Sequence, residues 1–139
     1  MGFDQFIPLW TDCNVSFPNC DDNQCMTLMH RYISEVLGNQ DIATLAVPQA
    51  SLLATNYPNY HNAELFNWTP NTPTNIPPKG AIIVWFANAV VGIPEGHVAM
   101  VVNADVNQFT SFDSNFPTGQ NPHLQGHDYT DVAGWLTLK

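Results

Sequence analysis

The chain of 139 residues has little positive charge. Three Lys and Arg residues (Arg31, Lys79 and Lys139) stand against twelve carboxylates, and the formal net charge is −9 at pH 7. Proteins that bind nucleic acid displace counterions from phosphate with a basic surface, and this sequence has no basic stretch to form one. The same deficit disfavours electrostatic docking on anionic lipid. We therefore expect neither nucleic acid nor an anionic membrane surface as a partner.

Long apolar segments are also missing. No apolar run approaches the roughly 20 residues of a membrane-spanning helix. Residues 1–5 lack the basic region and the long apolar core of a secretory leader. We therefore expect no membrane span, and we expect synthesis in a cytoplasm.

Cysteines are few, and their number is odd. Cys13 and Cys20 could pair in an oxidising compartment, which would leave Cys25 as the free thiol. Together with His30, the three cysteines could also be read as a zinc set, but their spacing fits no usual zinc-finger pattern. We expect no metal site, and the sequence leaves the disulfide open.

The first half of the chain predicts helices within a single domain spanning residues 1–139. In residues 24–37 apolar side chains recur at intervals of three and four, and Gly38 is suited to end the helix. Asp22 or Asn23 can cap its start. A second helical stretch is expected over 41–55, interrupted by Pro48. The flanking residues 1–22 and 56–79 are expected to be irregular.

The second half of the chain predicts strands. Short runs rich in β-branched and aromatic residues lie at 81–86, 97–102, 108–112 and 135–138. A helical first half followed by a strand-rich second half predicts an α+β fold, with N-terminal helices packed on an antiparallel sheet.

A cysteine and a histidine occupy the starts of two of these elements. Cys25 opens the helix over 24–37, where the positive end of the helix dipole favours the thiolate, the form that attacks carbonyl carbon. His97 opens the strand over 97–102 and is the type of base that such a thiol needs. The pair predicts a hydrolase or amidase with a cysteine nucleophile.

A hairpin supplies a third group. If the turn between strands 97–102 and 108–112 is symmetric about Asp105, His97 faces Asp113 directly and Asn115 is its diagonal neighbour. Either side chain could hold the imidazole in the right tautomer and stabilise the imidazolium. A slip of one residue in the register would separate them.

Several short motifs, taken in order, resemble those of CHAP domains. These domains are papain-like cysteine amidases and endopeptidases of peptidoglycan, and they are common in bacteriophage endolysins. The matching segments are Gln24-Cys25, Tyr-Ile-Ser-Glu-Val-Leu-Gly at 32–38, Pro-Lys-Gly-Ala-Ile-Ile-Val-Trp at 78–85, Gly-His-Val-Ala at 96–99, Phe-Asp-Ser-Asn at 112–115 and Gly-Trp-Leu at 134–136. The resemblance implies a papain-like α+β fold and one catalytic domain.

The resemblance also implies roles for single residues. Cys25 would be the nucleophile and His97 the base, with Asp113 in the acidic position that orients His97 and Asn115 in the nearby amide position. A tetrahedral intermediate needs an oxyanion hole, and the backbone N–H of Cys25 is a natural donor to it. The side chain of Gln24 is a further candidate for that hole.

Peptidoglycan is the substrate that the resemblance implies, cut either between muramic acid and L-alanine or within the peptide. The expected setting is a phage lysin, present in the host cytoplasm before lysis and acting at the cell wall through a separate wall-binding domain or holin-dependent access. Two alternatives stay open. One is an interbacterial amidase toxin, and the other is a catalytically silent structural or binding module of a phage particle.

Side chains outside the motifs have plainer interpretations. Trp68 and Phe66 could line a substrate groove, and packing in the core is the alternative. Polar, proline-containing stretches predict surface positions for His61, His123 and His127.

One departure from the family concerns metal. Some relatives bind calcium in a carboxylate-rich loop ahead of the cysteine that includes an Asp two residues after it, and this chain has Thr27 at that place. Asp21 and Asp22 are oxygen ligands by type, but their spacing does not reproduce the loop. We therefore expect no cofactor and activity without calcium.

Overall fold

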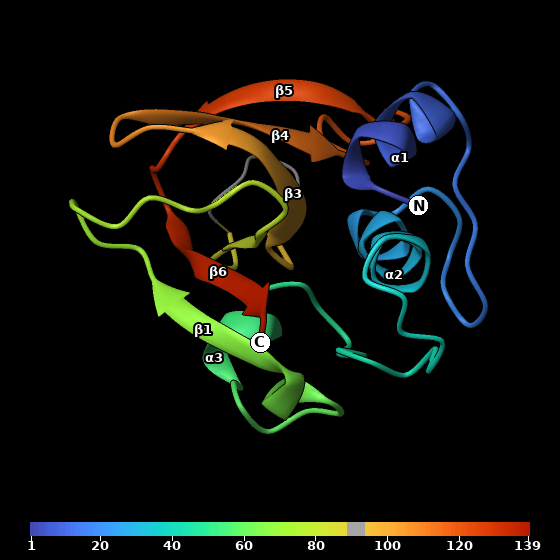
Figure 1. Cartoon of the computed structure of the whole chain (residues 1–139), viewed down its shortest axis with the longest axis horizontal. Coiled ribbons are helices and arrows are strands. Elements are labelled where there is room, and N and C mark those ends of the chain that lie inside the picture. Colours follow the sequence, from blue (N-terminus) through green and yellow to red (C-terminus); the bar gives the residue numbers. More distant parts are fainter. Residues whose placement is uncertain (89–93) are drawn as a thin grey trace.

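A six-stranded antiparallel sheet organises the computed structural model, which describes residues 1–88 and 94–139 (Figure 1). The strands are neighbours in the order β1-β6-β2-β3-β4-β5. Strands β1 and β5 form the two edges, and β6, β2, β3 and β4 lie between them. The bounds in spatial order are β1 (Phe66–Pro70), β6 (Val132–Leu138), β2 (Ile82–Trp85), β3 (His97–Ala104), β4 (Gln108–Asp113) and β5 (His123–Asp128).

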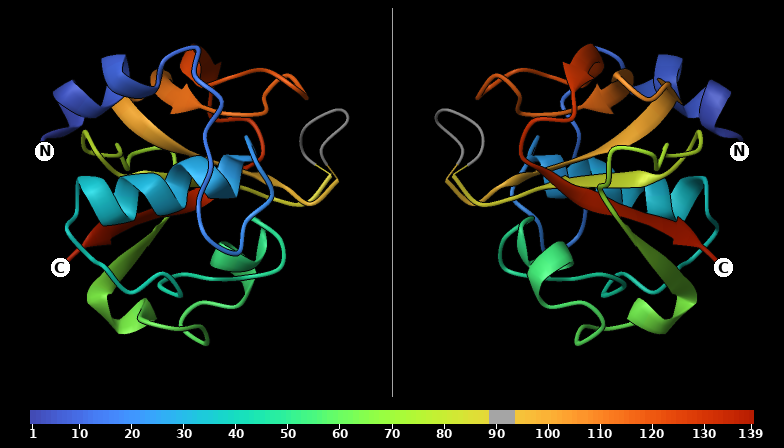
Figure 2. Two further views of the ribbon diagram at one scale, coloured as in Figure 1. Left: turned by 90° about the vertical axis from the view of Figure 1, so that its right-hand side faces the viewer. Right: turned by 90° about the vertical axis from the view of Figure 1, so that its left-hand side faces the viewer.

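The helices come from the first half of the chain: α1 (Phe3–Trp10), α2 (Cys25–Glu35), α3 (Leu52–Thr55) and the short 3-10 helix η1 (Ala63–Leu65). Helix α2 packs mainly on β3, and Figure 2 shows it lying across one face of the sheet. The predicted α+β fold, with N-terminal helices on an antiparallel sheet, is confirmed. Among the described residues, none of the helices combines the length and apolar character needed to cross a membrane.

The two faces of the sheet belong to two apolar clusters. Successive side chains of a strand point to opposite faces. Val84, Val98, Met100 and Phe112 lie in the cluster that contains Leu28, Met29, Tyr32 and Ile33 of α2. Trp85, Ala99, Val101, Phe109 and Trp135 form the cluster on the other face. Burial of each large apolar side chain stabilises the fold by about 1.5–3 kcal/mol.

Helix α2 is close to its predicted bounds, with a different cap. The residue at the N-cap is Gln24 in extended conformation, not Asp22 or Asn23, and no side chain hydrogen-bonds the cap. Asn23 has a left-handed backbone with φ of 62°, and its side chain accepts a hydrogen bond from the Val15 amide instead. Gly38, also left-handed with φ of 77°, follows the end of the helix.

The helix expected over 41–55 is wrong for most of its length. Only Leu52–Thr55 is α-helical. The Asp41 carboxylate accepts a hydrogen bond from the Ala43 amide, and Leu45 has a left-handed backbone with φ of 58°. These local turns take the place of a continuous helix, and the segment instead runs along the groove described below.

Helices α1 and η1 and strands β1 and β5 form in segments where the sequence analysis expects no regular element. Helix α1 forms within 1–22 because its apolar face packs, with Phe6 fully buried and its ring 5.8 Å from the Tyr32 ring and 6.1 Å from the Phe112 ring, centroid to centroid. Strand β1 lies in the stretch expected to be a loop, and β5 lies in the polar stretch after 116. Both strands are sheet edges.

Candidate active site

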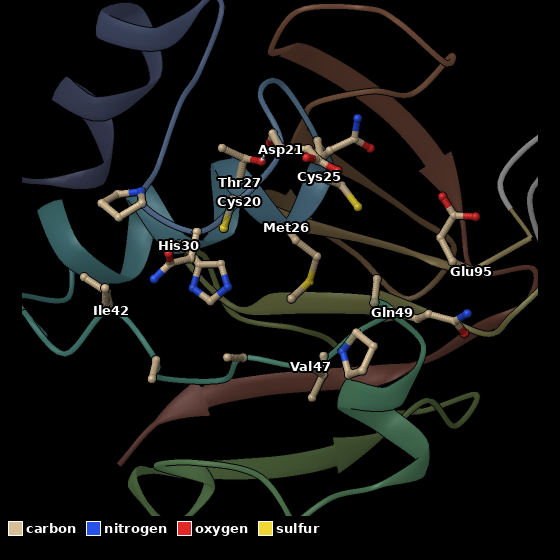
Figure 3. A pocket seen from close by; sticks show the side chains of 17 residues that line it. Cys20, Asp21, Cys25, Met26, Thr27, His30, Ile42, Val47, Gln49 and Glu95 are labelled. Carbon is tan, nitrogen blue, oxygen red and sulfur yellow. Dashed lines mark hydrogen bonds between the residues drawn. The ribbon is translucent and has the colours of Figure 1, made fainter.

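Cys25 is the first residue of α2 and lies at one end of a groove. The residue is 7% exposed, and its place at the helix N-terminus puts the positive end of the helix dipole next to the sulfur. The preceding residue, Gln24, also lines the groove. Figure 3 shows the Cys25 sulfur pointing into this space, between Met26 and Glu95.

His97 is the first residue of β3 and is fully buried. Gly96 before it has φ of +84°, and a Cβ at that position would lie 2.8 Å from the Trp85 carbonyl oxygen and 2.9 Å from Ser51 Cβ. Only glycine fits both the conformation and the space. Because Gly96 lets β3 approach β2 and the segment at Ser51, His97 enters the sheet in a fixed place, with its ring 5.0 Å from the Trp85 ring between centroids.

Asp113 ends β4 and is bound on both carboxylate oxygens. Its Oδ2 lies 3.0 Å from Nε2 of His97, and the Ser111 hydroxyl donates to Oδ1. Nε2 of His127 also lies 3.0 Å from Oδ2. The expectation of a surface position for His127 is wrong, since the side chain lies on β5 and is only 9% exposed. Sequence reasoning missed this contact because the polar stretch around His127 gave no strand signal.

The ionisation of His97 and that of Asp113 depend on each other. Burial by itself lowers the pKa of His97, but the hydrogen bond that His97 donates to Asp113 and the neighbouring Cys25 side chain outweigh it and raise that pKa to about 9. Burial raises the pKa of Asp113, yet the hydrogen bonds from His127 and His97 bring it to about 2. Nδ1 of His97 is buried and has no hydrogen-bond partner among the described residues. Since Nε2 binds Asp113, Nδ1 is the ring nitrogen available to Cys25.

The β3–β4 hairpin brings Asp113 to His97 with a strand register that differs from the predicted one. Met100 pairs with Phe112, whereas symmetry about Asp105 would pair it with Thr110. Asp105 accepts hydrogen bonds from the Asn107 and Gln108 amides, and the register shifts once more at a bulge between Val101 and Asn103. The difference at Met100 is two residues, so the side chains keep their face of the sheet. Asp113 therefore reaches His97 along the diagonal.

Asn115 lies elsewhere than predicted. Its backbone is left-handed with φ of 62°, which turns the chain away from the end of β4. The side-chain Nδ2 donates to Gln24 Oε1 at 2.9 Å, and Oδ1 accepts from the Gly119 amide at 2.7 Å. Among the described residues no hydrogen bond joins Asn115 to His97, and the side-chain partner of Asn115 across the site is Gln24.

A second hydrogen bond joins the same two segments. The buried Ser114 hydroxyl donates to the Asn23 carbonyl oxygen at 2.9 Å. Asn23 and Gln24 precede Cys25, while Ser114 and Asn115 follow Asp113. Two hydrogen bonds thus join the turn that precedes Cys25 to the turn that follows Asp113.

The groove beside Cys25 has a volume of about 560 Å³. Its walls are the start of α2, residues 18–21, the segment 42–50 and Glu95 (Figure 3). Met26, Ile42 and Val47 supply apolar surface, and Asp21 and Glu95 supply carboxylates. Among the described residues that line it there is no lysine or arginine.

Phe66 and Trp68 do not line this groove. Phe66 is fully buried in the core, and Trp68 packs against that core with its ring 6.2 Å from the Tyr57 ring between centroids. The plainer interpretation, packing, fits both. The groove surface comes instead from residues that sequence reasoning assigned to a helix.

The described residues offer no obvious metal site. Within 1–88 and 94–139, no three His, Cys, Asp or Glu side chains come together in a way that could hold a metal ion. Thr27 is buried, and its hydroxyl donates to the Asp21 carbonyl. Cys13, Cys20 and Cys25 are all free thiols.

Comparison with known proteins finds similarity in structure only. No protein-family model matches the chain, and no curated protein matches it by sequence. The crystal structure of a wild-type endolysin, LysIME-EF1, superposes with a TM-score of 0.72 at 17% identity, over 96% of this chain and 61% of that one. Ly7917 gives a TM-score of 0.66 at 18% identity, over 96% and 59%.

A second structure of Ly7917, with the hydrolysing product of MDP, gives a TM-score of 0.69 at 17% identity, over 96% of this chain and 60% of that one. The chain therefore spans about three-fifths of the length of the structures it matches. At these identities the likeness establishes the fold, which is the α+β fold found in an endolysin.

Proposed function

We propose that this chain is a peptidoglycan hydrolase with Cys25 as nucleophile and His97 as base. The observation that carries the proposal is the buried His97, bound to Asp113 through Nε2 and next to the Cys25 thiol at the mouth of a groove. Structural similarity to an endolysin adds support, as does similarity to a protein solved with a product of MDP, muramyl dipeptide, which is a fragment of peptidoglycan.

The proposed reaction is acyl transfer to sulfur followed by hydrolysis. The Cys25 thiolate attacks the carbonyl carbon of an amide, and a C–S bond forms. His97 passes its Nδ1 proton to the leaving nitrogen as the C–N bond breaks, which leaves a thioester and a free amine. Water then attacks the thioester with His97 as base, and the carboxylic acid and the thiol are released. Asp113 stabilises the imidazolium throughout and keeps the ring oriented.

Gln24 is the proposed side-chain donor to the oxyanion. Because Asn115 occupies Gln24 Oε1, the amide is held with one orientation, and its N–H₂ group remains for another acceptor. Gln24 and the Cys25 backbone N–H are adjacent in sequence at the start of α2. In this proposal Asn115 acts on the reaction through Gln24, not through His97.

The groove is the proposed place for the peptide part of the substrate. Its apolar wall and its carboxylates favour an uncharged or amine-bearing peptide over a polyanion. The scissile amide is either that between muramic acid and L-alanine or one within the peptide. In the proposed setting, a phage lysin reaches the wall with a separate wall-binding domain or by holin-dependent access.

Digestion of purified cell walls tests the proposal. The wild-type chain and Cys25→Ala are compared by release of soluble fragments, and mass spectrometry of the new ends identifies the bond. Cys13→Ala is the matched control, since Cys13 is an exposed thiol outside the groove. We expect fragments from the wild type and from Cys13→Ala but none from Cys25→Ala. Equal lysis by Cys25→Ala would contradict the mechanism, and no fragments from any of the three would favour a catalytically silent module.

A further inference from the structure

Two histidines bind one carboxylate oxygen in this structure. Nε2 of His97 and Nε2 of His127 each lie 3.0 Å from Oδ2 of Asp113, and Ser111 donates to Oδ1. His97 comes from β3 and His127 from the edge strand β5, with β4 between them. The proposed mechanism uses His97 and Asp113, and it leaves His127 without a role.

Aromatic rings enclose the His127 imidazole. Its centroid lies 5.1 Å from the Trp85 ring, 5.3 Å from the Phe109 ring and 5.2 Å from the Phe116 ring. Trp85 and Phe116 also contact the ring of His97, at 5.0 and 4.9 Å. The carboxylate and both imidazoles therefore share one enclosure and are largely shielded from solvent.

Packing alone does not account for a histidine at this place. An apolar ring could fill the same space among Trp85, Phe109 and Phe116, without the cost of burying an imidazole. What the imidazole adds is an N–H directed at Asp113. Because the carboxylate oxygen accepts, a hydrogen bond at this distance needs the proton of the His127 ring on Nε2.

We infer that His127 is a positioning residue, which donates from Nε2 to Asp113 and thereby holds the carboxylate against His97. The Ser111 hydroxyl fixes one oxygen and His127 fixes the other, so the plane of the carboxylate cannot rotate away from the His97 ring. His127 touches neither the groove nor Cys25, and it acts on the reaction through Asp113 and His97. The expected effect of His127 on turnover rests on the proposed function, whereas its hydrogen bond to Asp113 does not depend on that function.

Turnover by three variants tests the positioning role. His127→Phe keeps the ring packing and removes the donor, and we expect kcat to fall about 10- to 100-fold, the range for loss of a hydrogen bond to a charged group, with KM little changed. His127→Gln keeps an N–H donor and should recover most of that loss. The control is His61→Phe, an exposed histidine whose ring lies against Asp41, outside this cluster. Wild-type kcat in His127→Phe would overturn the inference.

Nitrogen NMR of the imidazoles tests the hydrogen bonds without any substrate. In the wild type we expect His127 with a proton on Nε2, and His97 signals that shift in His127→Phe but not in His61→Phe. A His127 protonated on Nδ1 only, or unchanged His97 signals in a folded variant, would overturn the inference. If His127→Phe does not fold, the wild-type tautomer and His127→Gln still decide. If walls are not cleaved at all, the proposed function fails while these spectra still decide the hydrogen-bond arrangement.

Discussion

The two sides of the candidate site are built in opposite ways. On the nucleophile side, Cys25 lies at a helix end and faces a groove of about 560 Å³. On the base side, His97, Asp113 and His127 are linked by hydrogen bonds and closed over by aromatic rings. An attacking atom needs access to substrate, whereas a base needs a fixed orientation and a stable charge. The difference indicates that changes on the base side should alter rate, and changes on the groove side should alter substrate binding as well.

The largest expected effect comes from Asp113→Asn, which breaks the base side. The amide keeps the shape of the carboxylate but removes the charge that favours imidazolium on His97, and it disturbs the tautomer. We expect kcat to fall about 10³- to 10⁴-fold, by analogy with the acidic member of hydrolase triads. Steady-state digestion of walls by the folded variant measures it. A loss below tenfold would place the orienting charge elsewhere.

A pH profile sharpens the same comparison. The pKa of His97 is raised to about 9, so the imidazolium partner of the thiolate is lost as pH rises through that value. We expect kcat to fall about tenfold per pH unit above about 9. The measurement is kcat against pH, and a profile unchanged from pH 8 to pH 10.5 would contradict the thiolate–imidazolium pair.

The free energy of unfolding should also depend on pH through His97 and Asp113. The stabilisation by His97 is lost at high pH, and that by Asp113 is lost at low pH. His97 has a folded-state pKa above its ordinary 6.5, so its stabilisation is complete below 6.5 and lost as pH rises through about 9. Asp113 has a folded-state pKa of about 2, below its ordinary 3.8, so its stabilisation is present above 3.8 and lost as pH falls through about 2. Thermal unfolding across pH, compared with His97→Gln, separates the two limbs. The variant should lack the upper one.

A smaller effect is expected from Asn115→Ala, on the nucleophile side. The change frees the Gln24 amide from its 2.9 Å hydrogen bond, and we expect kcat to fall about tenfold, the value of one hydrogen bond in a proposed oxyanion site that keeps its backbone donor. The His97 imidazole signals should not move. If they did, Asn115 would act on the base side after all. The double variant with Gln24→Ala should be no slower than Gln24→Ala alone.

The smallest expected effect is that of metal removal. The resemblance to CHAP domains would place a calcium-binding carboxylate at position 27, whereas this chain has Thr27, whose hydroxyl donates to the Asp21 carbonyl. Excess EDTA should leave wall digestion by the purified chain unchanged. Loss of activity that calcium alone restores would show that oxygen ligands near residues 19–23 assemble a site after all.

The sequence predicted the centre of the sheet and missed its edges. The inner strands β2, β3, β4 and β6 were expected, because burial on both faces produces continuous apolar runs. Edge strands have solvent on one side, and β5 alternates between half-buried and exposed positions with Gly126 in its middle. Strand β1 ends in Pro70, which an edge tolerates. Helix α1 was missed because tertiary packing of Phe6, more than local propensity, holds it in place.

For the candidate site, the positions of Cys25 and His97 were easier to predict from the sequence than their hydrogen-bond partners. Cys25 and His97 were identified from the element starts that they occupy, and Asp113 from a hairpin. The assumed register was wrong by two residues at Met100, but an even shift keeps side chains on the same face, so the contact with His97 survives. His127 could not be found, because its contact depends on an edge strand with no apolar signal. Asn115 could not be placed, because a left-handed residue redirects the chain after β4.

The two hydrogen bonds that join residues 23–24 to residues 114–115 have a consequence for folding. These hydrogen bonds join segments 91 residues apart in the chain, and they form only once β3, β4 and α2 have assembled. Contacts of such long range form late, because loop closure has to precede them. The same assembly of distant segments brings the His97 imidazole beside Cys25. The surroundings of the Cys25 sulfur are therefore a property of the folded domain, and no local stretch of the chain can reproduce them.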